Sequence, residues 1–251
     1  MRLKSFINRY IPFLIALLPV LIFRDFSPSD ELRYISIANE AIKHNHWLAF
    51  TYQEIPYAAV QPLYIWLLRI WKTLFLHHNM WSIGLLSVIP ALSIIWVMTR
   101  WVTKFDLGSM RLKDGSQTRH LAQFMLCVCG MQLAMSFYIR MEMLFSLWIT
   151  LALYNFWKLL YLPLGPNDLD VQPQRVEKPH HHNQCLFALY IFLAIFTQGA
   201  TGFYLIFLVT TLYLLCTRNI KLWGRVWNWR VWLILAGALG LWFYGTYLEG
   251  G

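Results

Sequence analysis

The sequence contains 251 residues, of which 58% are hydrophobic and only 13% are charged. A soluble domain carries about a quarter charged residues, so this composition argues against a soluble protein. The net charge of +9 would suit a nucleic-acid-binding protein, but Lys and Arg lie mainly between apolar runs, where membrane topology needs them, and we expect no nucleic-acid partner. The four cysteines lie in or beside apolar runs without zinc-ligand spacing, which predicts reduced packing residues and no metal site.

Apolar runs predict an all-α, polytopic membrane protein with about seven transmembrane helices. The runs cover residues 10–23, 80–102, 121–138, 143–162, 185–196, 203–216 and 231–247. A long polar segment follows the first run, and the stretch 62–76 after it is interrupted by Arg69 and Lys72, which predicts an amphipathic helix at the membrane interface. We expect one membrane domain over residues 1–251, as the N-terminal portion of a longer protein, because the last run ends close to Gly251.

The distribution of basic residues predicts the orientation of the chain. Lys and Arg gather at the N-terminus and in the loops after the second, fourth and sixth runs, so we expect these segments in the cytoplasm and the protein among the lipids of a cell inner membrane. The other connections then face the periplasmic side and hold a set of acidic and amide residues. These residues are Asp25, Asp30, Glu31, Glu40, Glu54, Glu142, Gln198 and Glu249.

The first outer loop opens with a helix signal. Ser29 is a candidate N-cap, and residues 30–42 would form about three turns with one apolar face. Asp30 falls inside this face, one turn before Tyr34, whereas Glu31 points to a flank. A carboxylate on an apolar face is costly unless it is paired or has a role, which favours a function for Asp30. Acids in a first turn also complement the helix dipole, and this interpretation stays open for Asp30 and is favoured for Glu31.

Two further polar groups lie at the ends of predicted spans. Arg140 and Glu142 occupy the tight turn before the fourth span, either as an interfacial ion pair or as a second carboxylate beside Asp30, with arginine available to hold phosphate oxygens. Gln198 and Gly199 break the apolar run between the fifth and sixth spans. The glycine ends a helix in one interpretation, and in the other a backbone N–H at the following helix start is offered to an anion.

Several motifs follow one another in an order that resembles a known family. They are Ser29-Asp30-Glu31-Leu32-Arg33-Tyr34 after the first apolar run, then His46-Trp47, Pro56-Tyr57 and Gln61-Pro62-Leu63-Tyr64-Ile65-Trp66-Leu67. Arg140-Met141-Glu142 and Thr197-Gln198-Gly199-Ala200 add looser matches. Together they resemble the GT-C glycosyltransferases of the protein-mannosyltransferase and lipid-A aminoarabinose-transferase kind, which show D-E-x-R-Y, K-P-P-L-L-Y-W-L-like and T-K-G-P segments.

The resemblance implies an enzyme that transfers a sugar from a polyprenyl-phosphate donor to a lipid, glycan or protein acceptor on the outer face of the membrane. It implies that no nucleotide donor is required at that step, that no cofactor is required, and that dependence on a divalent metal stays open. Asp30 would be the catalytic carboxylate and Glu142 the second acid. The residues expected to support them or to bind substrate are Glu31, Arg33, Tyr34, Arg140 and Gln198.

The chain departs from the family pattern at two likely phosphate-binding positions. The family's lysine before P-P-L aligns with Val60, and that of T-K-G-P aligns with Gln198, so Arg33, Arg140 or Lys72 would have to substitute. These losses keep a non-catalytic membrane partner open as an alternative. A transporter or flippase-like protein is the other alternative, but transporters place ionisable residues near the bilayer midplane, whereas the acids here lie at span ends on one side.

Overall fold

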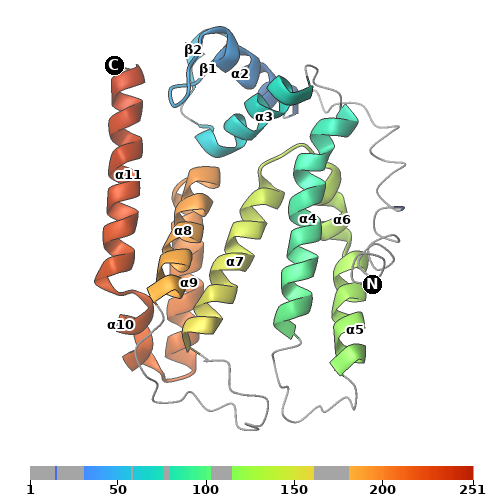
Figure 1. Cartoon of the computed structure of the whole chain (residues 1–251), viewed down its shortest axis with the longest axis vertical. Coiled ribbons are helices and arrows are strands. Elements are labelled where there is room, and N and C mark those ends of the chain that lie inside the picture. Colours follow the sequence, from blue (N-terminus) through green and yellow to red (C-terminus); the bar gives the residue numbers. More distant parts are fainter. Residues whose placement is uncertain are drawn as a thin grey trace. The chain divides into compact units, whose positions relative to one another are not determined.

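The computed structural model describes Ile15 and residues 31–57, 59–75, 80–102, 115–160 and 181–250, and the predicted first span and Ser29 lie outside the described residues apart from Ile15. The chain divides into two compact units, Met1–Leu147 and Trp148–Gly251, and α7 (Glu142–Leu160) contributes to both. The first unit also contains α2 (Glu31–Lys43), β1 (Thr51–Tyr52), β2 (Ile55–Pro56), α3 (Pro62–Phe75), α4 (Met80–Val102), α5 (Gly115–Val128) and α6 (Gly130–Phe137). The second also contains α8 (His181–Gln198), α9 (Ala200–Cys216), η1 (Ile220–Leu222), α10 (Trp223–Val226) and α11 (Trp229–Gly250) (Figure 1).

The predicted outer-loop helices are α2 and α3, which pack against each other within the first unit (Figure 1). The predicted apolar face of α2 is confirmed, because Tyr34, Ile37 and Ala38 are buried. On α3, the side chains of Tyr64 and Leu68 are fully buried. The helical period of 3.6 residues places the apolar side chains of each helix on one face, and the two faces pack together. This packing holds α2 against α3 within the unit.

A short antiparallel hairpin, β1–β2, lies between these helices and was not predicted. Thr51 pairs with Pro56 and Tyr52 with Ile55. The two residues of the turn, Gln53 and Glu54, both have positive φ, which is the backbone of the tight turn that favours hairpins. Since neither residue is glycine or asparagine, the turn carries no obvious sequence signal.

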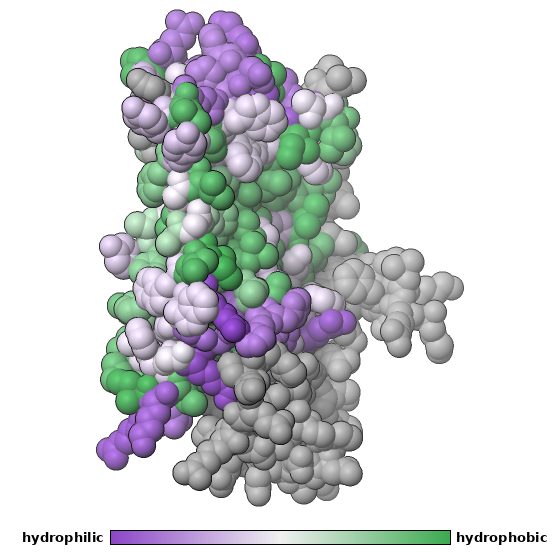
Figure 2. Space-filling view, turned by 60° about the vertical axis from the view of Figure 1, so that its left-hand side comes forward, coloured by the Kyte–Doolittle hydropathy of each residue, from purple (hydrophilic) through white to green (hydrophobic). Residues whose placement is uncertain are grey.

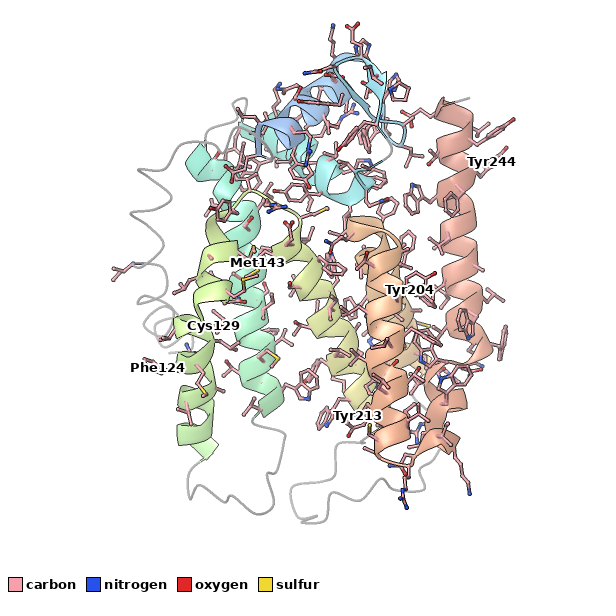
Figure 3. The ribbon with its side chains drawn as sticks, turned by 180° about the vertical axis from the view of Figure 1, so that it is seen from behind. Phe124, Cys129, Met143, Tyr204, Tyr213 and Tyr244 are labelled. Atoms are coloured by element: carbon pink, nitrogen blue, oxygen red, sulfur yellow. The ribbon has the colours of Figure 1, made fainter. Side chains whose placement is uncertain are left out.

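Three described helices are long and apolar enough to cross a membrane, over Ser82–Val102, Glu142–Leu160 and Trp229–Glu249, and Ala200–Cys216 is a shorter apolar helix. The all-α, polytopic membrane class is therefore confirmed. The predicted span 80–102 has the same bounds as α4, but the predicted span 121–138 is interrupted at Cys129, between α5 and α6. Figure 3 labels Phe124 on α5 and Cys129 at the break between the two helices. All four cysteines are free thiols, as expected.

In the second unit, α8 packs against both α9 and α11. Gly199, with φ of 67°, separates α8 from α9. Many large apolar side chains of α9 and α11 are exposed, including Leu208, Leu241 and Phe243, and hydrophobic residues cover much of the face drawn in Figure 2. Tyr244 is 63% exposed and points away from α11 in Figure 3. Such surfaces suit helices that face lipid or further protein.

Candidate functional site

The carboxylate of Glu31 joins the start of α2 to the turn before α7. Its side chain is fully buried, and its Oε1 accepts a hydrogen bond of 2.8 Å from the backbone N–H of Ile139. The prediction that Glu31 points to a flank is wrong. Spacings of three, four and seven residues place it on the same helix face as Tyr34, Ile35 and Ala38, and that face is buried.

The contact with Ile139 brings the start of α2 next to the residues that begin α7. Arg140 and Glu142 form the ion pair expected for this turn, with Nη2 of the arginine 3.0 Å from Oε1 of the glutamate. Ser87 of α4 donates a hydrogen bond of 2.6 Å to the carbonyl oxygen of Tyr138, which belongs to the same peptide group as the N–H of Ile139. The turn is therefore held from α2 and from α4 at once.

Two tyrosines lie beside these acids. The rings of Tyr34 and Tyr64 meet edge to face with centroids 5.5 Å apart, and the guanidinium of Arg33 lies 5.9 Å from the centroid of the Tyr34 ring. Burial raises the pKa of the Tyr64 phenol well above its ordinary 10.0, and Tyr34, Glu142 and Glu31 raise it further. We call Glu31, Tyr34, Tyr64 and Glu142 the Tyr64 cluster. At neutral pH its phenol at position 64 is a neutral hydrogen-bond donor beside carboxylates.

The basic residues of α3 are occupied by α2 and by the segment that follows it. Arg69 donates to the carbonyl oxygen of His46 at 2.8 Å and to Oδ1 of Asn45 at 2.7 Å, and its guanidinium lies 3.8 Å from the centroid of the Trp47 ring. Lys72 donates to Oδ1 of Asn39 at 2.5 Å. Both side chains thus link α3 to the C-terminal part of α2 and the residues after it. Lys72 is already hydrogen-bonded to Asn39.

The other two residues expected in the site are Asp30 and Gln198. Asp30, the expected catalytic carboxylate, lies outside the described residues. Gln198 ends α8 and belongs to the second unit, where its Oε1 is buried without a hydrogen-bond partner among the described residues. The structure therefore gathers Glu31, Tyr34 and Glu142, and it places Arg33 beside Tyr34 and Arg140 beside Glu142.

Tyr64 is the member of the cluster that sequence reasoning missed. It stands in the apolar stretch 62–76, where a buried aromatic side chain is ordinary core. Its signal was the hydroxyl group, because a tyrosine on the buried face of an amphipathic helix needs a partner for its oxygen.

The architecture is an all-α membrane fold of the GT-C-like kind, and two solved structures of ArnT are similar to it. The apo structure of ArnT from Cupriavidus metallidurans matches 99% of this chain and 43% of its own, with a TM-score of 0.77 and 18% identity. ArnT from the same organism bound to undecaprenyl phosphate matches 98% of this chain and 42% of its own, with a TM-score of 0.79 and 18% identity. No family model and no curated protein matches the sequence. This chain thus has the fold of part of ArnT and spans less than half its length.

Proposed function

We propose that the protein is a GT-C membrane glycosyltransferase that moves a sugar from a polyprenyl-phosphate donor to a lipid, glycan or protein acceptor on the outer face of the inner membrane. The observation that carries the proposal is the likeness of its fold to ArnT bound to undecaprenyl phosphate, at a TM-score of 0.79. The donor class comes from that bound lipid and from the resemblance of the motifs around Asp30.

The chemistry needs a base, a leaving group and cations. An oxygen of the acceptor attacks the anomeric carbon of the sugar, the bond from that carbon to the phosphate oxygen breaks, and polyprenyl phosphate leaves with the bonding electrons. Asp30 takes the proton of the acceptor hydroxyl. Supporting this role, its neighbour Glu31 contacts Ile139, which places the start of α2 close to the turn that carries Glu142.

Arg33 and Arg140 are the cations that we assign to the phosphate. Arg140 is 3.0 Å from Glu142, so the guanidinium that holds a phosphate oxygen would also orient the second carboxylate. Lys72 is a poorer choice, because it already donates to Asn39. In the second unit, Gln198 at the break between α8 and α9 would offer its amide to a polar group of the substrate.

A non-catalytic membrane partner is the second candidate, and Val60 is the observation in its favour. This residue stands where the family pattern has a lysine, and it is buried with 7% of its surface exposed. No cation replaces the lysine at that position of the sequence. Sugar transfer by the wild-type protein would rule this candidate out.

The proposal is tested by sugar transfer in membranes that carry the intact protein. Labelled sugar on undecaprenyl phosphate is supplied as donor, and transfer to endogenous acceptors is measured for wild type, Glu142→Gln and Glu249→Gln. Glu249 is the control, because it is another acid at a span end on the predicted outer side. We expect Glu142→Gln to lower the rate by about 10²–10⁴ and Glu249→Gln to leave it unchanged. Transfer no faster than in membranes without the protein would contradict the proposal.

A further inference from the structure

Two polar atoms of the Tyr64 cluster are buried and lack a hydrogen-bond partner among the described residues. They are Oη of Tyr64 and Oε2 of Glu142. The whole Tyr64 side chain is buried, whereas Glu142 has 26% of its side chain exposed, with Oε1 engaged by Arg140. A buried polar atom left without a partner costs free energy, so each of these two atoms calls for an explanation.

Packing alone does not explain the hydroxyl of Tyr64. Its ring meets the Tyr34 ring edge to face at a centroid distance of 5.5 Å, and a phenylalanine at the same position would make the same contact. Within the part of the chain that the structure describes, the hydroxyl adds only an unpaired donor and acceptor in the interior. A role in ligand binding accounts for its presence, since the partner would arrive with the ligand.

The two atoms are complementary in hydrogen bonding. The neutral phenol of Tyr64 donates, and Oε2 of Glu142 accepts. Contacts place the two residues in one neighbourhood. The Tyr64 ring meets the Tyr34 ring, and Glu31, on the same buried face of α2 as Tyr34, accepts from the N–H of Ile139, three residues before Glu142. A hydroxyl group, which is uncharged and both donates and accepts, satisfies both atoms.

We propose that Oη of Tyr64 and Oε2 of Glu142 together bind a hydroxyl group of a sugar. This inference rests on the proposed function, which supplies the sugar, and it assigns a binding role to a residue of α3. The sugar is that of the lipid-linked donor or that of a glycan acceptor. Both present the same chemistry, and the experiment distinguishes them.

The test uses Tyr64→Phe in the intact protein, because this change removes only the hydroxyl. Tyr52→Phe in the hairpin is the matched control, since it removes a hydroxyl from the same unit outside the Tyr64 cluster. The first measurement is thermal unfolding without ligand in detergent. We expect Tyr64→Phe to unfold at the same temperature as wild type or higher. A clearly lower temperature would show that the hydroxyl already has a partner within the protein and would overturn the inference.

The second measurement compares the affinities of bare undecaprenyl phosphate and of undecaprenyl phosphate that carries a sugar. The ratio of the two affinities isolates the contribution of the sugar and does not require turnover. If the bound sugar hydroxyl belongs to the donor, Tyr64→Phe should reduce this ratio by about tenfold and leave the affinity for bare lipid unchanged. Tyr52→Phe should leave both quantities unchanged. If it belongs to the acceptor, the ratio stays constant and the KM for a glycan acceptor rises about tenfold instead.

Other outcomes separate this inference from the proposed function. Wild-type transfer with an unchanged ratio and an unchanged acceptor KM in Tyr64→Phe would overturn the inference and leave the proposed function standing. Weaker binding of bare undecaprenyl phosphate by Tyr64→Phe would also overturn it, because the hydroxyl would then contact phosphate. If the wild-type protein transfers no sugar but Tyr64→Phe loses the contribution of the sugar to affinity, the sugar contact would be upheld and the proposed catalysis contradicted.

Discussion

The Glu31 carboxylate connects segments that lie 108 residues apart in the sequence. Its partner is a backbone N–H in the turn that precedes α7, so the bond holds the start of α2 against this turn within the first unit. Glu31 therefore has a positioning role, and we keep the role of base for Asp30. Sequence reasoning singled out both acids as candidates, but it could not identify the backbone N–H that Glu31 binds, because that group carries no side-chain signal.

At Glu31 we predict a difference between two substitutions. Glu31→Ala leaves the buried N–H of Ile139 unpaired and should destabilise the protein by about 1–3 kcal/mol, whereas Glu31→Gln keeps an acceptor oxygen and should cost less. Unfolding in detergent, followed by circular dichroism, measures both. Equal stability of Glu31→Ala and wild type would show that the bond to Ile139 contributes nothing.

The hairpin β1–β2 depends on one side chain of α2. The Glu40 carboxylate accepts hydrogen bonds from the Thr51 hydroxyl at 2.8 Å and from the backbone N–H groups of Gln53 at 2.9 Å and Glu54 at 3.3 Å.

The hairpin was missed because its turn lacks the glycine or asparagine of common hairpin signals. The helices around it were predicted because their apolar residues recur at helical spacing, and α3 ends within one residue of the predicted stretch. The break at Cys129 was missed because the apolar run continues through it.

The hairpin should loosen in acid. Burial raises the pKa of Glu40, but the hydrogen bonds from Thr51, Gln53 and Glu54 and the nearby His44 outweigh it and hold the pKa below the ordinary 4.5. The stabilisation is therefore fully present above pH 4.5 and is lost as the pH falls through the lower, folded-state pKa. Hydrogen exchange at the N–H groups of Gln53 and Glu54, relative to α3, measures this loosening.

The variant Glu40→Gln should speed that exchange already at neutral pH. Glu54→Gln is the control, because its carboxylate lies 3.9 Å from Lys43 and both side chains are largely exposed, so their ion pair contributes little. Protection of these N–H groups, relative to α3, that does not change between about pH 3 and pH 7 would contradict the role of Glu40.

The close approach of α8 and α9 depends on Gly202. A Cβ at this position would lie 2.6 Å from the carbonyl carbon of Ala194 and 2.7 Å from its oxygen. Gly202→Ala should therefore push the helices apart and destabilise the protein by about 1–3 kcal/mol. Gly240→Ala in α11 is the control, since no described atom lies within 4 Å of the added carbon, and it should be neutral or stabilising by up to about 1 kcal/mol. Thermal unfolding of both variants in detergent checks the prediction, and equal effects would contradict it.

At the scale of the whole molecule, the sequence was most informative about class. The hydropathy of the runs predicted a polytopic helical membrane protein, and the motifs around Asp30 predicted the GT-C-like fold that ArnT shares with this chain. The gathering of Glu31, Tyr64 and Glu142 was not predicted, because it depends on contacts between α2, α3 and the turn before α7. Sequence periodicity describes one helix at a time and does not specify such contacts.

The orientation in the membrane is a prediction at this same scale. In a variant whose four native cysteines are replaced by alanine, Asn45→Cys should react with a membrane-impermeant thiol reagent added from outside, and His181→Cys only after the membrane is opened. Both positions are exposed in the structure, so accessibility within the protein is not limiting. Labelling of position 45 only from the cytoplasm would reverse the orientation derived from Lys and Arg.

The most direct test of the proposed function compares Asp30→Asn with Glu31→Gln in the transfer of labelled sugar from undecaprenyl phosphate, in membranes that carry the intact protein at equal amounts. Asp30→Asn keeps the shape of the side chain but removes the base, so the rate should fall by about 10²–10⁴ while insertion is unchanged. Glu31→Gln should retain most of the activity, because its amide oxygen can still accept from Ile139. An essential Glu31 with a dispensable Asp30 would show that the base is misassigned, and wild-type rates in both variants would contradict a glycosyltransferase site in this loop.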